Sequence, residues 1–372
     1  MPSLRVAVAA LVALVSSIAL ASVLSAGTGR AAGPYDFDFG EDDPWWHHPL
    51  PAILPPPPAE VRVPYDPTDN YVHELSHFMG LAVSTIRDRN AAVKVTTNFG
   101  RFPWDESAIT DGRRYFGELP ELDVTSVTIY PDYDPVVLNK IPQIVTDFAQ
   151  LGKPVEIAEI GVCTFRHTLD QQRILLNVYF DTLVLIPPSR VFVYELQDHN
   201  DSASSTSPCE STFGLKKVDG TSKPAYEVFI ANLGRFPTVG VTGRVLFSED
   251  TNLDAEMFRR NVDDLARRGV RNVNMTTEWW KVATITDGRL TWDEAKWNTV
   301  AGAIAYAASK GLRVRLHTSP PWLDGTTRGE YEAVVVEYYE RVAGLSIVDT
   351  IQIYNEANQF RFTDYVPVAR LF

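Results

Sequence analysis

The chain has 372 residues, of which 45% are hydrophobic and 22% are charged, so it can form one large globular domain or two medium ones. Its formal net charge is -13 at pH 7. An acidic surface repels the phosphate backbone, and no basic cluster offsets the charge, so nucleic acid is excluded as an expected partner.

Residues 1–32 are predicted to be a signal peptide. Arg5 precedes an apolar run over residues 6–24, and small residues suited to cleavage occur at 19–21 and 30–32. This pattern is typical of export, which predicts a secreted or cell-surface protein. The alternative is an uncleaved membrane tether, because the run is nearly long enough to span a bilayer.

Residues 33–66 are rich in proline and acidic residues and include four consecutive prolines. Such a composition favours a stiff, extended segment. We therefore expect a linker or an arm that wraps the following domain.

From residue 67 onward, strand-like and helix-like segments alternate. In residues 67–236, strands are expected at 93–98, 123–130, 155–161 and 191–194, and helices at 69–89, 138–151, 171–185 and 225–233. In residues 237–372, strands are expected at 239–245, 270–275, 312–316 and 348–354, and helices at 254–268, 292–310 and 330–343. Such alternation of short apolar strands with helices indicates a parallel sheet covered by helices.

Eight expected strands favour one closed (β/α)8 TIM barrel, of class α/β, over residues 67–372. A doubly wound open sheet is the alternative. It is disfavoured because no glycine-rich phosphate loop follows a first strand.

Two of the expected strands end in a glutamate. Glu159 lies in the strand at 155–161, and Glu356 follows the strand at 348–354. Because TIM barrels carry their active sites at the C-terminal ends of the strands, both carboxylates are expected to face one cleft. Such a pair can cleave a glycosidic bond: one carboxyl protonates the leaving oxygen, and the other attacks the anomeric carbon or activates water. A salt bridge or a solvated cap is the alternative for either glutamate taken alone.

Around these glutamates the sequence resembles the large clan A of retaining glycoside hydrolases, which carry two catalytic glutamates on the fourth and seventh strands of a TIM barrel. IQIYNEANQ resembles the acid/base motif of the clan, and KPVEIAEIG resembles its nucleophile strand. The resemblance implies that Glu356 is the acid/base, that Glu159 is the nucleophile, and that Asn355 holds the sugar 2-hydroxyl.

The resemblance covers about residues 67–372. VTIYPDYDP resembles the sixth strand, residues 269–322 the second and third strands with their helix, and residues 192–226 the eighth strand and its loop. It implies that Tyr130 hydrogen-bonds the nucleophile. The other implied substrate-binding residues are Tyr194, His317, Trp322, Trp280 and Asn98.

The strands stand in an unusual order for this clan, in which the acid/base strand precedes the nucleophile strand. Here residues 67–236 resemble strands five to eight, and residues 237–372 resemble strands one to four. The chain end TDYVPVARLF also resembles TDNYVHELSHF, at the start of the first helix. We therefore expect a circularly permuted barrel, as a monomer or as a dimer that exchanges halves. The alternative is a fragment of a tandem-barrel protein.

The function expected from the resemblance is hydrolysis of a poly- or oligosaccharide by double displacement, with no metal or organic cofactor and a carboxyl separation of roughly 5 Å. Two positions depart from the clan pattern. Tyr194 replaces the usual eighth-strand tryptophan, and Asn274 lies near the place of a frequent arginine. A catalytically weak or inactive carbohydrate-binding barrel is therefore the alternative function.

The chain has two cysteines, Cys163 and Cys209, which can form one disulfide or remain two free thiols. The resemblance places them on the loops after two neighbouring strands, which implies a bridge beside the active site. His167 and His199, on the same loops, are expected to be solvated.

Residues 73–77 read HELSH, which matches the zinc-protease pattern H-E-x-x-H. In a helix, His73 and His77 point away from one apolar face, formed by Leu75, Met79, Ala82 and Ile86. Because that face is expected to pack on the barrel, both histidines should face solvent. A zinc metalloprotease is therefore the least favoured hypothesis.

Overall fold

The structure is a computed structural model. It describes residues 70–100, 104–130, 137–199, 209, 211–236, 238–244, 255–286, 288–319 and 328–354. All of these belong to one compact unit, Pro64–Phe372. The segments expected as a signal peptide and a proline-rich arm lie outside the described residues, as do Trp322, Asn355 and Glu356.

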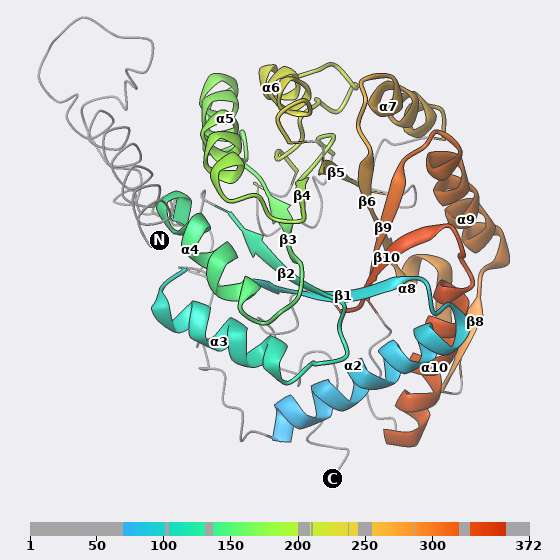
Figure 1. Cartoon of the computed structure of the whole chain (residues 1–372). Helices are drawn as coiled ribbons and strands as arrows, with labels where there is room; N and C mark the ends of the chain where they lie inside the picture. The colour runs from blue at the N-terminus through green and yellow to red at the C-terminus, as the bar shows by residue number, and fades with distance from the viewer. Residues whose placement is uncertain are drawn as a thin grey trace, which may run out of the picture. The chain divides into compact units, whose positions relative to one another are not determined.

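Within the described residues, eight parallel strands close into a barrel (Figure 1). In chain order they are β1 (Lys94–Gly100), β2 (Val124–Ile129), β3 (Val155–Ile160), β4 (Arg190–Val193), β5 (Val239–Arg244), β6 (Asn272–Glu278), β9 (Arg313–Ser319) and β10 (Val348–Gln352). The first strand, β1, pairs in parallel with the last, β10, with Val95 opposite Ile351. This pairing confirms the expected (β/α)8 barrel and excludes the open sheet.

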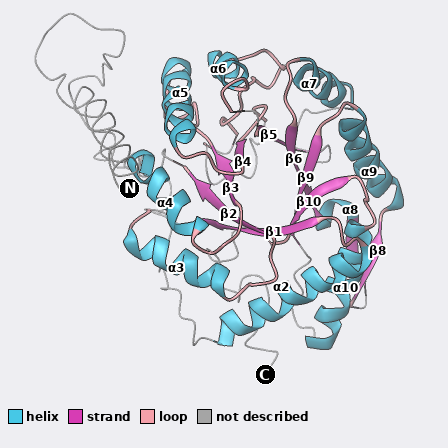
Figure 2. Cartoon of the chain, viewed as in Figure 1, coloured by secondary structure: helices cyan, strands magenta, loops and turns pink. Residues whose placement is uncertain are grey.

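Helices form a layer around the barrel (Figure 2). They are α2 (Asn70–Arg89), α3 (Glu106–Gly117), α4 (Val137–Ala149), α5 (Leu169–Leu185), α6 (Pro224–Asn232), α7 (Ala255–Arg267), α8 (Trp279–Val282), α9 (Glu294–Ser309) and α10 (Arg328–Ala343). The main hydrophobic core joins strand residues such as Val127 and Ile157 to helix residues such as Phe148. Among the described helices, none is both long and apolar enough to span a membrane.

Three elements were not expected from the sequence: α3, α8, and the antiparallel hairpin of β7 (Ala283–Thr286) and β8 (Arg289–Trp292). The start of α3 is fixed by Asp105, which accepts a hydrogen bond from the Ala108 backbone N–H at 2.8 Å. Gly112 lets α3 approach α4 closely, because a Cβ at this position would stand 2.5 Å from the Phe148 ring.

The barrel interior contains a buried ion pair that crosses it. Glu156 of β3 is fully buried, and its Oε1 lies 2.7 Å from Nε of Arg315, on β9. The sheet order places β3 and β9 on opposite sides of the ring. Arg190 of β4 also contacts Glu156, at 2.8 Å, and reaches Asp349 of β10 at 2.6 Å. Two arginines and two acidic residues therefore tie facing strands together with balanced charge.

The pKa of Glu156 depends on opposing effects. Burial by itself raises the pKa, but the charges of Arg315 and Arg190 and the hydrogen bond from Ser126 outweigh burial and lower it. A carboxyl whose pKa is lowered in the folded state stabilises the fold at pH above its unfolded pKa. That contribution is lost as the pH falls through the folded pKa, so this network makes the barrel sensitive to acid.

A second polar layer lies closer to the C-terminal ends of the strands. Asn98 of β1 donates to Thr128 Oγ1 of β2 at 3.0 Å and accepts from Gln352 of β10 at 2.9 Å. All three side chains are fully buried. Their hydrogen bonds offset the cost of burying polar groups across the β1–β10 closure.

We expect Arg315→Met to lower the free energy of unfolding by about 3–5 kcal/mol, because it leaves the Glu156 charge buried with one partner fewer. Urea denaturation of the full chain measures this change. The matched control is Arg173→Met, which removes an exposed pair with Asp170 and should change the stability by about 0–1 kcal/mol. Equal, small effects of both substitutions would contradict a structural role for the cross-barrel pair.

Candidate active site

Glu159 lies near the C-terminal end of β3, three residues after Glu156. Residues three apart in a regular strand point to opposite faces. Here the register of β3 shifts against both neighbouring strands, between Val127 and Thr128 of β2 and between Ile157 and Ile160 of β3 itself. Such a bulge re-aims a side chain and is frequent beside active sites.

Arg315, fully buried in the barrel interior, interacts electrostatically with Glu159 as well as with Glu156. Burial lowers the pKa of the Arg315 guanidinium, while the negative charges of Glu156 and Glu159 oppose that effect. Glu159 is 8% exposed, whereas Glu156 is fully buried. Glu159 is thus the carboxylate nearer the mouth, and the bulge gives the two glutamates different surroundings.

Tyr130, which directly follows β2, donates a hydrogen bond from its hydroxyl to Glu159 Oε2 at 2.8 Å. The hydrogen bond expected from the sequence is therefore present. Both side chains are nearly buried, Tyr130 at 7% exposure and Glu159 at 8%. A hydroxyl that donates to a carboxylate favours its ionised form. The pair provides an oriented carboxylate at the face of the barrel where active sites lie.

Tyr194 follows β4 and is half-buried beside this pair. Its ring centroid is 6.0 Å from that of Tyr130, and Phe213 lies 5.2 Å from Tyr130 and 5.5 Å from Tyr194. The rings meet edge-to-face or tilted, which is the favourable geometry for aromatic pairs. Phe213 was not singled out from the sequence, because nothing in one chain shows that its loop returns to β2.

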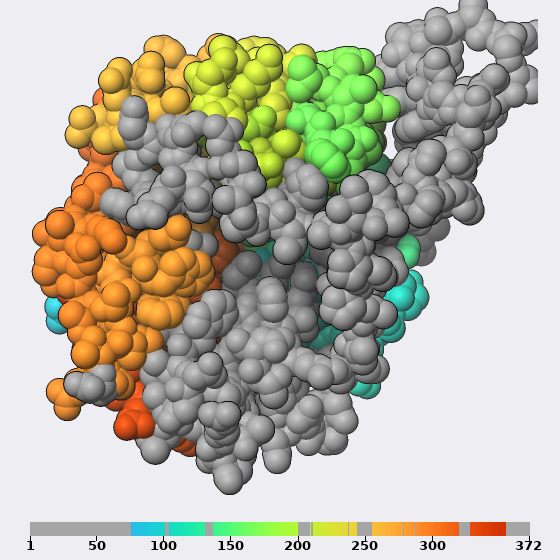
Figure 3. Space-filling model, turned by 180° about the vertical axis from the view of Figure 1, so that it is seen from behind, coloured from blue at the N-terminus to red at the C-terminus, as the bar shows by residue number. Residues whose placement is uncertain are grey.

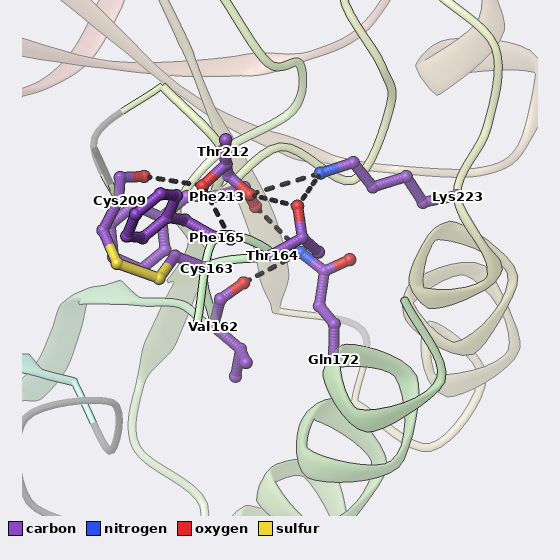
Figure 4. Close-up of a disulfide and its surroundings, with 9 residues drawn as sticks. All are labelled: Val162, Cys163, Thr164, Phe165, Gln172, Cys209, Thr212, Phe213 and Lys223. Carbon is purple, nitrogen blue, oxygen red and sulfur yellow. Dashed lines mark hydrogen bonds between the residues drawn. A yellow bond between two sulfur atoms is a disulfide. The ribbon is translucent and has the colours of Figure 1, made fainter. Parts of the chain in front are cut away.

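Cys163 and Cys209 form a disulfide, with 5.2 Å between their Cα atoms (Figure 4). This confirms the expected bridge and excludes two free thiols. Both cysteines are buried. Cys163 lies on the loop after β3, four residues after Glu159, and Cys209 lies on the loop after β4, fifteen residues after Tyr194. The bridge therefore fastens together two loops at the mouth of the barrel.

The remaining expected substrate-binding residues lie at different depths. His317 of β9 is 8% exposed and stands two residues after Arg315, so both side chains point to the same face, the barrel interior. Trp280 of α8, directly beyond β6, is 44% exposed. Figure 3 shows the molecule from behind, with the surface of the part of the chain around residue 300 in orange. Asn98 is fully buried in the polar layer beneath the mouth. Trp322, Asn355 and Glu356 lie outside the described residues.

Tyr354 precedes Asn355 and has a φ of 50°, in the left-handed region that non-glycine residues rarely adopt. Its side chain is buried, its hydroxyl lies 3.4 Å from that of Tyr331, and its carbonyl accepts from Thr97 Oγ1 at 3.0 Å. Backbone strain of this kind concentrates at functional sites, where the surrounding contacts hold it. The strained residue directly precedes the sequence NEAN at residues 355–358, and its backbone conformation could not be inferred from the sequence.

A further buried acid, Glu195, follows Tyr194 and was not singled out from the sequence. Its Oε1 lies 3.3 Å from Nε2 of His199, and both side chains are 2% exposed. The expectation that His199 is solvated is therefore wrong, because its loop folds inward against β5 and α7. The pair lines a cavity of about 30 Å³ together with Gln197 and Asn261, enough space for a water molecule.

The HELSH segment lies in α2, on the outside of the barrel. Phe78 and Met79 are buried, whereas His77 is exposed and hydrogen-bonds Glu332 of α10 at 2.8 Å. The expected outward direction of His77 is confirmed, and the side chain of His73 lies outside the description. Among the described residues, no group of three or more histidine, cysteine, aspartate or glutamate side chains is arranged to hold a metal ion.

Comparison with family models and with curated proteins finds no match for this sequence. Solved structures share the barrel. They include xylanase 10B from Thermotoga maritima, with 10% identity and a TM-score of 0.46 over 74% of this chain and 85% of that one. A GH10 endoxylanase from a sugarcane soil metagenome has 8% identity and a TM-score of 0.45, over 75% of this chain and 90% of that one. Dihydropteroate synthase from Thermus thermophilus has 12% identity and a TM-score of 0.41, over 72% of this chain and 91% of that one. Since one barrel hosts many chemistries, the function must be argued from the site.

We expect His77→Ala to change the free energy of unfolding by less than about 1 kcal/mol, because the exposed side chain contacts only the surface residue Glu332 and the edge of the neighbouring Phe78 ring among the described contacts. A metal chelator should leave the melting temperature of the wild-type protein unchanged. Calorimetry with and without chelator measures both effects. Stoichiometric zinc in the purified protein that disappears in His77→Ala would overturn this view of the HELSH segment.

Proposed function

We propose that the protein is a retaining glycoside hydrolase that cleaves O-glycosidic bonds of a poly- or oligosaccharide. The observation that carries the proposal is the hydrogen bond from Tyr130 to Glu159 at the C-terminal end of β3. It combines a carboxyl group oriented by a hydroxyl donor, near-complete burial and the catalytic face of the barrel. The bulge that re-aims Glu159 supports the proposal, since a purely structural acid needs no such irregularity.

The proposed mechanism is double displacement. Glu159 attacks the anomeric carbon and forms a glycosyl-enzyme ester, while the carboxylic acid of Glu356 protonates the departing oxygen. Glu356, now a carboxylate, takes a proton from water, which attacks the same carbon and releases Glu159. Glu356 follows Tyr354 by two residues, just beyond β10. The mechanism requires the two carboxyl groups to stand roughly 5 Å apart.

The proposed carbohydrate contacts surround this pair. His317 faces the interior from β9, and Tyr194 lies beside Tyr130. Trp280 offers an exposed aromatic surface beyond β6, suited to the apolar face of a sugar ring. Asn355 and Trp322 complete the proposed set by resemblance to the clan.

We propose in addition that the strand order is a circular permutation of the clan order and that the protein is exported. The order of the two glutamate motifs along the chain supports the first point, and the pairing of β1 with β10 provides the closed barrel that a permutation requires. The disulfide between Cys163 and Cys209 supports the second, because disulfides persist in oxidising compartments.

We expect Glu159→Gln to lower kcat for aryl glycosides by on the order of a thousandfold or more, because an amide cannot attack the anomeric carbon. A panel of aryl glycosides and polysaccharides, assayed with the full chain, measures this loss. The matched control is Glu340→Gln, the same chemical change at an exposed position of α10, which should keep wild-type activity. Full activity of Glu159→Gln contradicts the proposed nucleophile.

Two further measurements separate the alternatives. A 2-deoxy-2-fluoro glycoside with a good leaving group should label the peptide that contains Glu159, as detected by mass spectrometry. NMR of the first product should show retention of the anomeric configuration. Sugar binding without turnover by the wild-type chain would instead support a carbohydrate-binding barrel that has lost catalysis.

A further inference from the structure

The mouth of the barrel contains a small buried cluster that is separate from the main hydrophobic core. It consists of Tyr130, Phe213 and the disulfide partners Cys163 and Cys209, with the half-buried Tyr194 packed against them. Tyr130 belongs both to this cluster and to the hydrogen bond with Glu159. The other members of the cluster therefore pack against the tyrosine whose hydroxyl contacts the proposed nucleophile.

Phe213 contacts both tyrosine rings of the cluster. Its side chain is 1% exposed, and its centroid lies 5.2 Å from that of Tyr130 and 5.5 Å from that of Tyr194. The ring of Phe213 carries no polar atom, so its contribution is packing alone. Because protein interiors are close-packed, removing part of this ring gives the Tyr130 ring space to tilt.

Hydrogen bonds and the disulfide fasten the loop that carries Phe213 to the loop after β3 (Figure 4). The Thr164 backbone N–H donates to Thr212 O at 3.0 Å, and the Phe165 N–H donates to Thr212 Oγ1 at 3.1 Å. The buried ammonium of Lys223 donates to Thr164 Oγ1 at 3.0 Å and to Thr212 O at 3.2 Å. The position of Phe213 is thus fixed by several bonds that converge on its neighbour in the chain.

We propose that Phe213 and the Cys163–Cys209 disulfide are positioning residues that hold the Tyr130 hydroxyl against Glu159. The consequence for catalysis rests on the proposed function, whereas the positioning itself does not. The phenol oxygen lies at the far end of its ring, so a small tilt displaces it most. Since a hydrogen bond of 2.8 Å between oxygens is near the optimum, a displacement of about 0.5 Å weakens it strongly.

The decisive variant is Phe213→Leu, with Phe180→Leu of α5 as the matched control. Phe180 is also 1% exposed, but it lies in the main core. The measurement is the pKa of the Glu159 carboxyl, followed by carbon-13 NMR of the labelled full chain and assigned with Glu159→Gln. We expect Phe213→Leu to raise this pKa, because a weakened hydrogen bond stabilises the carboxylate less. Phe180→Leu should leave it unchanged.

The same substitution should alter the kinetics of an active enzyme. The acid limb of the kcat/KM profile should move to higher pH in Phe213→Leu, because Glu159 must be ionised to attack. At the pH optimum, kcat/KM should fall on the order of tenfold, as for partial loss of a hydrogen bond to a charged group. A residue that served only stability would leave the pH profile unmoved.

A double-substitution cycle identifies Tyr130 as the intermediary. In a Tyr130→Phe background there is no hydroxyl to misplace, so Phe213→Leu should no longer shift the pKa of Glu159. The pair Cys163→Ala and Cys209→Ala, made together, should act in the same direction as Phe213→Leu and lose its effect in the same background.

The proposal is overturned if Phe213→Leu moves the pKa of Glu159 no more than Phe180→Leu does, or if the shift persists without the Tyr130 hydroxyl. The NMR titration needs no turnover, which separates the two claims. If the wild-type chain hydrolyses no glycoside but the pKa shifts as expected, the proposed function fails and the positioning role stands.

Discussion

The ion pair between Glu156 and Arg315 is the constraint on which the rest of the barrel depends. It crosses the interior from β3 to β9, and both side chains are fully buried. Buried charges are tolerated only when they are paired and hydrogen-bonded, so the register of these two strands is fixed by the need to keep the pair intact. Arg190 extends the network from β4 to Asp349 of β10. The ion pair therefore fixes the positions of β3 and β9, which carry Glu159 and His317, along the barrel axis.

The polar interior also explains how the closure of the barrel is specified. TIM barrels are usually filled by branched apolar side chains, whereas here Asn98, Thr128 and Gln352 form a hydrogen-bonded layer above the ion pairs. Asn98 and Gln352 each lose a partner if β1 and β10 separate or slip. Because an unsatisfied buried amide costs about 1–3 kcal/mol, the layer penalises any other pairing of the first and last strands.

The sequence predicts the barrel well because short apolar strands and longer helical segments alternate from residue 67 onward. It misses α3 because Asp111 and Gly112 weaken the helical pattern, and the reason for Gly112, a close approach to Phe148, exists only in the folded state. The β7–β8 hairpin did leave a signal, the Asp-Gly pair at 287–288 between alternating residues. Within the site, the strand-end position of Glu159 is readable, whereas the bulge, Phe213 and the burial of His199 all depend on packing between distant segments.

The contrast between Glu156 and Glu159 shows that position on a strand alone does not distinguish a structural carboxylate from a candidate nucleophile. Both lie on β3 and both are nearly or fully buried. Glu156 is contacted by two guanidinium groups and by Ser126, which tie up its oxygens and neutralise its charge. Glu159 accepts a hydrogen bond from the neutral hydroxyl of Tyr130, and a hydroxyl that donates to a carboxylate favours its ionised form. The bulge sets the partners of the two glutamates apart, and this difference is what supports Glu159, rather than Glu156, as the proposed nucleophile.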